Sequence, residues 1–344
     1  MRILIFTTEI TPYFENSYRS LIADGHILQV FCTNSDRAKN RFPPHSKSEN
    51  LQFLAMSDLR VGNALRQCKD FQPDLVIVPA LLNLKFIYIS LLVSGKKVLI
   101  SDTFWHGTLK QKIICALGRN VLSRIFDFAF VPGSRQVDFM YRLGFRKGSV
   151  FTGLYAVPLG RITPDSILGK ERSLLFIGRL ANEKNILNTV AGYLDYRNRV
   201  QNPYVLKIAG IGGFFDSLKN LPGVILLGYV NNQNLPELFQ HSDALVLMST
   251  FEPWGVVISE ATANARPVIC SAACGSSTDL VINGINGYVL EIPTISEISS
   301  VFEKFHNLSP AELLSMAEHS ISIAGNFGKN DWVYTIRRIE RLIT

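Results

Sequence analysis

Short apolar runs rich in β-branched residues alternate with longer amphipathic segments along the whole chain. In the first half, the predicted strands include Ile3–Thr7, Leu28–Cys32 and Leu75–Val78, and the predicted helices include Ser17–Asp24 and Leu109–Arg124. Such alternation is typical of parallel sheets whose strands are connected by crossover helices. The sequence therefore predicts an α/β fold.

A break in this pattern indicates two domains. Residues 159–172 are rich in Pro, Gly and charged side chains, which is typical of a linker, and a second strand–helix series starts directly after them. A chain of 344 residues is also long enough for two domains. We therefore predict two Rossmann-like, doubly wound domains that face a central cleft at the carboxyl ends of their strands. Their predicted bounds are 1–158 and 173–328, with a final helix in 329–344 that packs back on the first domain.

Composition narrows the class of protein. Hydrophobic residues make up 47% of the chain and charged residues 18%, which suits a globular protein and excludes a disordered one. The five cysteines include no C-x-x-C pair and no nearby His that would complete a zinc site, so reduced thiols are expected. The N-terminal residues lack the apolar core of a signal peptide. A membrane span over residues 75–93 would carry Lys85 near its centre, so a strand, a turn and a helix are expected there. Because reduced thiols are expected and the N-terminal residues do not form a signal peptide, we predict a cytoplasmic protein.

Positive charge is concentrated in the first half of the chain. Residues 1–160 contain 20 Lys and Arg residues against 11 Asp and Glu residues, whereas the remainder is close to neutral. This asymmetry indicates an anionic partner for the first half, with ordinary surface solubilisation as the alternative. The basic residues are scattered and form no known recognition motif, which argues against nucleic acid.

The segment 251–282, FEPWGVVISEATANARPVICSAACGSSTDLVI, predicts an anion site with two acids beside it. Pro253 suits the first turn of a helix, and Gly255 allows close approach of the backbone. A helix over Val256–Ala265 would present unpaired N–H groups and a partial positive charge at its start. Glu252 before the helix and Glu260 inside it are good acceptors for hydroxyl groups. A phosphate seat flanked by hydroxyl-binding acids is typical of a nucleotide-sugar pocket.

Glycines and cations follow several predicted strands of the second half. After the first of them come Gly178, Arg179 and Lys184, so two cations would neutralise a diphosphate in the cleft. Later strands are followed by Gly210 and Gly212, and by Gly228, Tyr229 and Val230, where the last three form a plausible shelf for a base. Tight packing between strand and helix explains Gly210 and Gly212 equally well, so an NAD site is not predicted.

The second half of the chain resembles the retaining glycosyltransferases of family 4, which have the GT-B fold. The resemblance rests on GRLANEKN, IAGIGG, LLGYV and the continuous segment 242–289, with its Glu-x7-Glu pattern around P-W-G. It implies that Arg179 and Lys184 hold the donor diphosphate, that Glu252 accepts hydrogen bonds from the donor sugar, and that Glu260 binds the ribose. The other implied donor-binding residues are Gly178, Gly210, Gly212, Gly228, Tyr229, Val230, Gly255 and Val256.

The first half also resembles this family, over Asp127–Phe145. The loop SDTFWHG implies His106 as a catalytic residue near the reacting sugar, beside Arg179, Lys184 and Glu252, and Asp102 as a weaker acceptor residue. The loop after the first strand, TTEITPYFENSY, lacks the paired glycines of many family members. Acceptor contacts by Glu9, Thr11 and Tyr13 are therefore an open alternative, and inferences about the acceptor from better-known members are in doubt.

The resemblance implies a metal-independent transferase without a cofactor, because cations take the place of a divalent ion and the sequence has no D-x-D triplet. It would transfer a sugar from a nucleoside diphosphate sugar, with UDP favoured, to a glycan or a lipid-linked oligosaccharide in bacterial-type cell-surface polysaccharide assembly, such as lipopolysaccharide. The basic first half would contact the inner face of an anionic membrane. The alternatives are an epimerase or phosphorylase of the same fold, and a non-catalytic two-domain sugar-binding protein.

Overall fold

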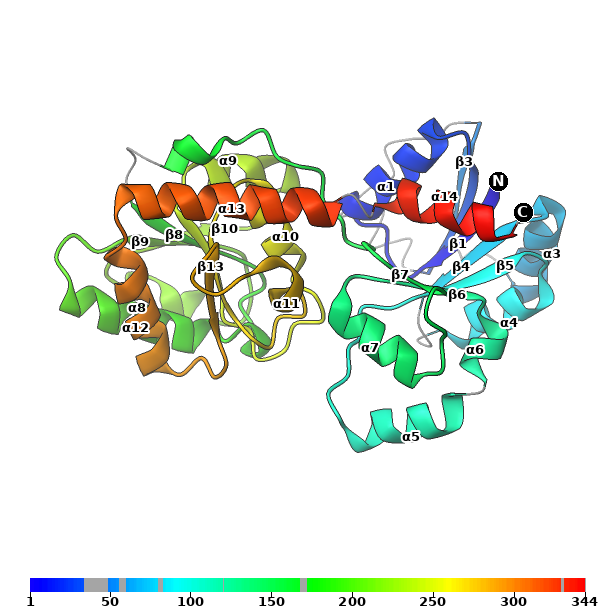
Figure 1. Ribbon diagram of the computed structural model, residues 1–344, viewed down its shortest axis with the longest axis horizontal. Coiled ribbons are helices and arrows are strands. Elements are labelled where there is room, and N and C mark those ends of the chain that lie inside the picture. Colours follow the sequence, from blue (N-terminus) through cyan, green and yellow to red (C-terminus); the bar gives the residue numbers. More distant parts are fainter. Residues whose placement is uncertain are drawn as a thin grey trace. The chain divides into compact units, whose positions relative to one another are not determined.

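The computed structural model describes residues 1–33, 49–55, 60–79, 83–119, 121–167, 172–328 and 331–343. Contacts within the chain define two units, which are described separately (Figure 1). The first unit contains Met1–Ala156 and Asn330–Thr344, and the second contains Val157–Lys329. Within the described ranges, none of the helices combines the length and the hydropathy needed to cross a bilayer.

The first unit is built on a parallel sheet with the strand order β3-β2-β1-β4-β5-β6-β7. This order is that of a doubly wound fold with one strand added. The strands are β1 (Arg2–Thr7), β2 (Ile27–Cys32), β3 (Leu51–Ala55), β4 (Leu75–Pro79), β5 (Lys96–Ile100), β6 (Phe128–Val131) and β7 (Val150–Thr152). The helices are α1 (Pro12–Ala23), α3 (Val61–Phe71), α4 (Leu84–Leu92), α5 (Leu109–Gly118), α6 (Leu122–Ile125), α7 (Ser134–Arg142) and α14 (Trp332–Ile343).

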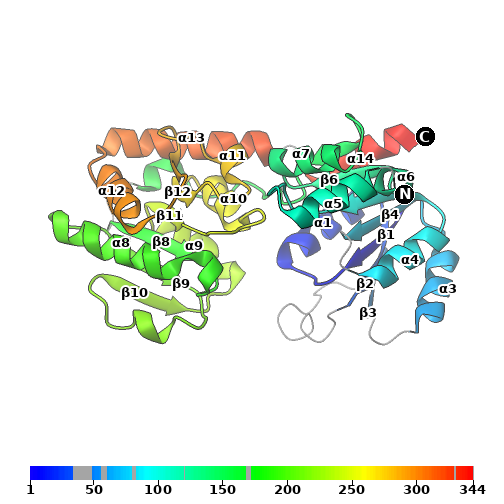
Figure 2. The same ribbon diagram turned by 90° about the horizontal axis from the view of Figure 1, so that it is seen from below.

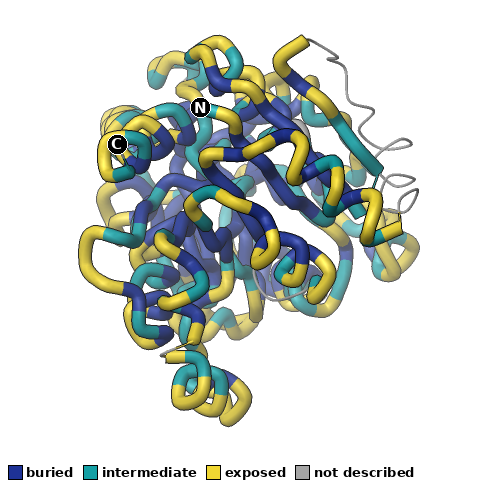
Figure 3. Tube along the Cα trace, turned by 90° about the vertical axis from the view of Figure 1, so that its right-hand side faces the viewer, coloured by how far each residue is buried: buried dark blue, intermediate teal, exposed yellow. Residues whose placement is uncertain are grey.

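Alternate residues of each strand of this sheet feed two separate cores. In β1, Leu4 and Phe6 join the core formed with α3, α4, α6 and α7, whereas Ile3 and Ile5 join the core formed with α1 and α14. The two faces differ because successive side chains of a strand point to opposite sides of the sheet. Both faces are therefore covered, and Figure 3 shows the buried strands surrounded by helices with exposed outer surfaces.

The second unit is built on a parallel sheet with the order β10-β9-β8-β11-β12-β13. Its strands are β8 (Ser173–Ile177), β9 (Val205–Ala209), β10 (Val224–Gly228), β11 (Ala244–Leu247), β12 (Val268–Ser271) and β13 (Gly287–Leu290). Its α-helices are α8 (Ile186–Arg199), α9 (Leu235–Gln240), α10 (Val256–Ala263), α11 (Ser277–Leu280), α12 (Ile295–His306) and α13 (Pro310–Gly328). The prediction of two parallel-sheet α/β domains is thus confirmed.

The segment expected as a linker, 159–172, has structure of its own where it is described; residues 168–171 lie outside the described ranges. Pro164–Ile167 forms a 3-10 turn, the Gly160 amide donates to the Ala263 carbonyl at 2.7 Å, and Arg266 donates to Ser166 Oγ at 2.5 Å. These residues therefore pack as part of the second unit.

The end of the chain completes the first unit. In α14, Trp332 is buried in the core beside α1, and its indole N–H donates to the Leu154 carbonyl at 3.0 Å. Arg337 forms an ion pair with Asp24, which follows α1. The apolar face of α14 is thus held by the first sheet; residues 329, 330 and 344 of the predicted C-terminal segment are not among those described.

Two predicted helices differ from those observed. The helix expected over Leu109–Arg124 is divided into α5 and α6, and α5 ends at Gly118, a residue that disfavours a continued helix. The helix expected at Ser17–Asp24 begins earlier, at Pro12, because Thr11 caps it and Pro suits its first turn. Thr11, a candidate acceptor residue, thus has a structural role as the helix cap, because its Oγ1 accepts from the Phe14 amide at 3.4 Å.

Candidate active site

Glycines at the carboxyl ends of β8, β9 and β10 allow the loops that follow these strands to touch through their backbones. The Gly178 amide donates to the Ala209 carbonyl at 3.0 Å, and the Gly210 amide donates to the Gly228 carbonyl at 2.7 Å. A Cβ on Gly210 would lie 1.8 Å from the Gly178 carbonyl oxygen, and one on Gly212 would lie 2.4 Å from that of Leu180. Both glycines are therefore required by close packing, but this packing is between the loops after β8 and β9 and not between a strand and a helix as predicted.

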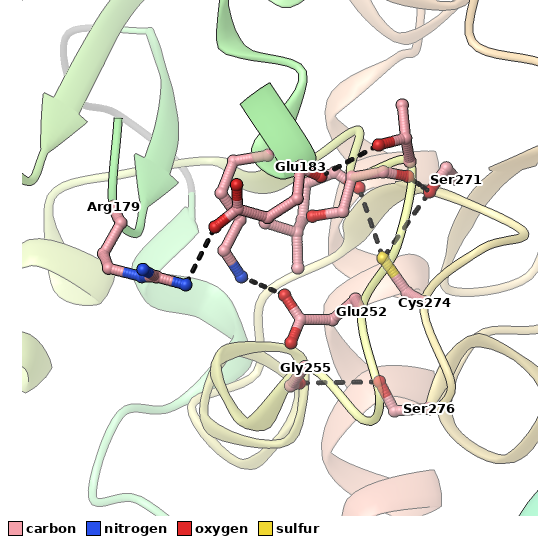
Figure 4. A network of polar contacts seen from close by, with 11 residues as sticks. Arg179, Glu183, Glu252, Gly255, Ser271, Cys274 and Ser276 are labelled. Carbon is pink, nitrogen blue, oxygen red and sulfur yellow. Dashed lines mark hydrogen bonds and ion pairs between the residues drawn. The ribbon is translucent and has the colours of Figure 1, made fainter. Parts of the chain in front are cut away.

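Lys184 and Glu252 meet at the centre of the candidate site (Figure 4). Lys184 ends the 3-10 turn Asn182–Lys184 after β8, and its ammonium group forms an ion pair with the Glu252 carboxylate. Their side chains are 16% and 14% exposed, so the pair is sheltered but reachable from solvent. The Thr250 amide donates to the Glu183 carbonyl at 2.9 Å, which ties the two loops together. Residues 68 positions apart are thereby held at one point.

Arg179 lies at the outer side of this cluster. Its guanidinium donates to the Glu183 carboxylate at 2.8 Å, and its side chain is 76% exposed. Figure 4 shows Arg179 directed toward Glu183 and not toward Glu252, whose ion pair is with Lys184. The structure thus brings the two predicted cations into one region, but pairs each with a different acid. Glu183 was missed in the sequence, although its spacing of four residues from Arg179 is that of a helical ion pair.

The start of α10 lies directly beside Glu252. Gly255 precedes the helix with φ of 87°, a left-handed conformation that favours glycine, and a Cβ there would lie 3.2 Å from Glu252 Cγ. Trp254 is buried, donates its indole N–H to Ser259 Oγ at 3.1 Å, and stacks on Phe327 of α13. The P-W-G sequence therefore combines an aromatic anchor with a turn that places the start of α10, at Val256, beside Glu252.

A second loop, residues 271–277 after β12, supports this junction. The Gly275 amide donates to the Glu252 carbonyl at 2.9 Å, and the Ser276 amide donates to the Trp254 carbonyl at 2.8 Å. The Ser271 hydroxyl donates to the Ser249 carbonyl at 2.5 Å from the base of the same loop. These backbone contacts fix the segment around Glu252. No role was predicted for this loop, although the run SAACGSS at the end of a strand was a usable signal.

Glu260 lies one turn further along α10, in different surroundings. It is half-buried and lines a cavity of about 660 Å³ within the second unit, together with Asn264, residues 157–163 and Ser166, and several residues of 232–240. Burial raises the pKa of the Glu260 carboxyl to about 7. Tyr229 is 59% exposed at the end of β10, shortly before the part of the chain that borders the same cavity. Val230, the last residue of the proposed shelf, is half-buried.

The candidates in the first unit follow β1 and β5. Asp102 is half-buried and accepts from the Tyr155 hydroxyl at 3.3 Å, and burial raises the pKa of its carboxyl. The ring of His106 lies 4.1 Å from that of Phe104, and its pKa is lowered by partial burial and by the charge of Arg135. Both residues therefore lie in one loop at the carboxyl edge of the sheet.

Glu9 and Tyr13 belong to the segment that follows β1, at the same carboxyl edge of the first sheet. The Glu9 carbonyl accepts from the Thr7 hydroxyl at 2.8 Å, and Tyr13 lies half-buried in the first turn of α1. These contacts order the loop locally, and they assign neither side chain to a ligand.

Comparisons with known proteins agree with this geometry. Residues 164–319 match the profile of the family described as Glycosyl transferases group 1. An uncharacterized glycosyltransferase of Methanocaldococcus jannaschii is 32% identical over 34% of this chain and 31% of its own length. A glycogen synthase of Mycobacterium tuberculosis is 34% identical over 33% of this chain and 29% of its own length. The chain thus matches less than a third of each of these relatives.

Similarity to solved structures extends over the whole chain. The pneumococcal O-GlcNAc transferase GtfA, solved with UDP and GlcNAc, has a TM-score of 0.74 at 11% identity and covers 100% of this chain and 99% of its own. Anabaena HepE, solved with UDP and glucose, has a TM-score of 0.68 at 15% identity with the same coverage. The chain therefore has the GT-B fold. Together with the match of residues 164–319 to the glycosyl transferases group 1 profile, this supports a GT-B glycosyltransferase.

Proposed function

We propose that the protein is a retaining glycosyltransferase that transfers a sugar from a nucleoside diphosphate sugar, with UDP favoured, to a hydroxyl group of a glycan or a lipid-linked oligosaccharide. One observation carries the proposal: the ion pair of Lys184 with Glu252 lies beside the start of α10. A cation, a hydroxyl-binding acid and a helix start are thereby gathered in one place. The UDP and sugars named with the GtfA and HepE structures support this class of donor.

Each residue of this cluster has a chemical role in the proposal. Lys184 and Arg179 stabilise negative charge on the diphosphate as the bond to the sugar breaks. Lys184 holds one oxygen of Glu252, which leaves the other to accept a hydrogen bond from a sugar hydroxyl. Gly255 allows the donor to approach the first amides of α10. Glu260 would bind the ribose from its place on the cavity wall.

The proposed mechanism needs no covalent enzyme intermediate. The acceptor hydroxyl attacks on the face that the diphosphate leaves, and an oxygen of the diphosphate takes the acceptor proton. The new glycosidic bond then has the configuration of the bond that was broken. Positioning and charge stabilisation supply the catalysis, and the cations take the role that a divalent metal has in other transferases.

The proposed setting is cell-surface polysaccharide assembly, with the basic first half in peripheral contact with the inner face of an anionic membrane. The charge asymmetry of the chain supports this contact. A lipopolysaccharide outer core galactosyltransferase, WaaB, has the same fold, with a TM-score of 0.66 at 16% identity. The comparisons do not favour an epimerase, a phosphorylase or a non-catalytic sugar-binding protein.

The test measures release of nucleoside diphosphate from a panel of UDP- and GDP-sugars, with and without glycan acceptors. Lys184→Ala and Glu252→Gln should lower acceptor-dependent release about 100-fold or more, because each removes charge or hydrogen bonding at the transition state. Lys219→Ala is the matched control, since Lys219 forms an exposed ion pair with Asp216 in the same unit. Full activity in both site variants would refute the site. Release of nucleoside diphosphate at the same rate with and without every acceptor would favour hydrolysis or isomerisation instead. A product whose anomeric configuration is inverted, as determined by NMR, would refute retention.

A further inference from the structure

Helix α5 presents an apolar stripe on its outward side. Leu109, Ile113 and Leu117 are spaced four residues apart and are 74%, 49% and 74% exposed. On the opposite side, the Gln111 side chain is buried and donates to the Phe104 carbonyl at 2.7 Å, and Ile114 packs on the first core. The helix is therefore anchored by its inner side, and its aliphatic side chains remain outside. Figure 3 shows this helix, the lowest in the view, as largely exposed.

Cations lie along both margins of this stripe. Helix geometry places Lys110 on one side of it and Lys112 and Arg119 on the other. None of these three side chains forms a salt bridge with a described residue. Residues 103–126 contain no Asp or Glu. The outward face of α5 is consequently apolar in the middle and positive at the edges.

Two other features of the first unit share part of this character, since α4 is apolar on its outer side and a cavity beside α5 is lined by cations. In α4, Leu84, Tyr88 and Leu91 are 79%, 55% and 50% exposed, while Phe86 and Ile89 pack on the same core as the inner side of α5. Both helices thus cover the same face of the sheet, and Figure 2 shows them from below. A cavity of about 690 Å³ next to α5 is lined by Arg119, Arg124 and Arg146, and by Asp127, which is paired with Lys96.

We propose that the outward face of α5, with α4 on the same side of the sheet, is the surface with which the protein lies on an anionic lipid bilayer. An apolar stripe bordered by cations is the pattern of a helix that lies in the membrane interface. A second copy of the chain is a poor occupant, because a two-fold contact would bring the cationic margins together without carboxylates between them. Anionic lipid headgroups supply the negative charge that this face lacks.

This docking mode deepens the proposed function, on which the next step rests. Helix α5 begins directly after the loop that carries Asp102 and His106. A bilayer in contact with α5 would therefore lie close to the candidate acceptor residues. The class of acceptor that fits is one whose hydroxyl group is presented from a lipid at the membrane surface.

The experiment is co-sedimentation of the full chain with vesicles of phosphatidylcholine alone or mixed with phosphatidylglycerol. The triple variant Leu109→Gln, Ile113→Gln, Leu117→Gln should lose about tenfold or more of its binding to the mixed vesicles. The triple variant Lys110→Gln, Lys112→Gln, Arg119→Gln should lose the preference for phosphatidylglycerol and the sensitivity to salt. The matched control, Ile282→Gln with Ile292→Gln, removes aliphatic side chains that are 53% and 67% exposed in the second unit, and should bind like the wild type.

Three outcomes would overturn the docking surface: a wild type that binds neither vesicle, an aliphatic variant that binds like the wild type, or light scattering that shows a dimer dissolved by that variant. Donor turnover measured without vesicles separates this inference from the proposed function. The aliphatic variant should keep the wild-type release of nucleoside diphosphate with a soluble acceptor. Loss of vesicle binding with unchanged turnover supports the surface, whereas an inactive wild type that still binds vesicles refutes only the proposed function.

Discussion

The two units share a parallel-sheet plan, but the carboxyl ends of their sheets are built differently. In the second unit, loops after β8, β9, β10, β11 and β12 hold one another through backbone hydrogen bonds and through the ion pair of Lys184 with Glu252. In the first unit, the candidate residues lie on two loops, after β1 and β5, which are tied to neighbouring segments through side chains, such as those of Tyr155 and Gln136 on Asp102 and that of Thr33 on Thr8. Backbone hydrogen bonds between loops require glycines and other specific residues at fixed positions. This requirement explains why the second unit carries the recognisable motifs.

The largest effect should come from the helix that closes the first unit. Trp332→Ala removes a buried indole and its hydrogen bond to Leu154, and should lower the free energy of unfolding of this unit by about 3–5 kcal/mol. Hydrogen exchange should show loss of protection in β1, β4 and α1 with little change in the second unit. Trp332→Phe is the control and should retain more of the stability. Equal loss of protection in both units would contradict the prediction that Trp332 stabilises the first unit and not the second.

The second-largest effect concerns the affinity for the donor, which should depend on residues of the second unit and not on those of the first. Lys184→Ala should weaken the binding of a nucleoside diphosphate sugar about 100-fold, because the diphosphate loses a charge-assisted contact. His106→Asn, in the first unit, should leave that affinity within about twofold and lower the rate of transfer instead. Isothermal titration gives the affinity and a transfer assay gives the rate. Weaker donor binding in the His106 variant would place this residue in the donor site.

Glycine substitutions should sharpen the contrast in backbone packing. Gly210→Ala places a Cβ against the Gly178 carbonyl and should destabilise the second unit by about 1–3 kcal/mol, measured by urea unfolding. Gly62→Ala is the control in the first unit, since outside its own helix backbone and chain neighbours no atom of a described residue lies within 4 Å of the added Cβ, and its effect should stay below about 1 kcal/mol. A Gly210 variant as stable as the wild type would mean that the loops can separate without cost.

The smallest effect concerns pH. Because burial raises the pKa of Glu260 to about 7 in the folded chain, the folded state binds more protons than the unfolded state between the ordinary pKa of Glu and pH 7. Stability should therefore fall as the pH rises through this window and level off above it. Glu260→Gln should flatten that slope in thermal unfolding at stepped pH, whereas Glu237→Gln, on α9, should not. An unchanged slope in the Glu260 variant would exclude this carboxyl as its source.

Much of the fold follows from hydrophobic pattern alone. Runs such as Ile3–Thr7 and Leu75–Val78 are apolar on both faces of a buried strand, and they were predicted within a residue of β1 and β4. The edge strand β3 was missed because Leu51–Ala55 pairs on one side only, with β2, and most of its residues are not buried. Helix ends depended on local chemistry, as the capping of α1 by Thr11 shows.

The candidate site was predictable in its residues and less so in its pairings. The sequence placed Lys184, Glu252 and Gly255 near strand ends, but it could not show that Lys184 and not Arg179 reaches Glu252. That choice depends on the 3-10 turn at Asn182–Lys184 and on the backbone contact of Glu183 with Thr250. The cavity wall at Glu260 likewise depends on residues from 157 to 264, which no local pattern connects.

The position of α14 also bears on how the chain is made. Residues 1–156 leave the ribosome well before Trp332, so one face of the first sheet must wait for the last helix while the whole second unit is synthesised. During that interval the second unit has all of its own strands and can fold first. The amino-terminal lobe is therefore the later of the two to mature, and a nascent chain stalled before Trp332 would expose the part of the first core that this side chain fills.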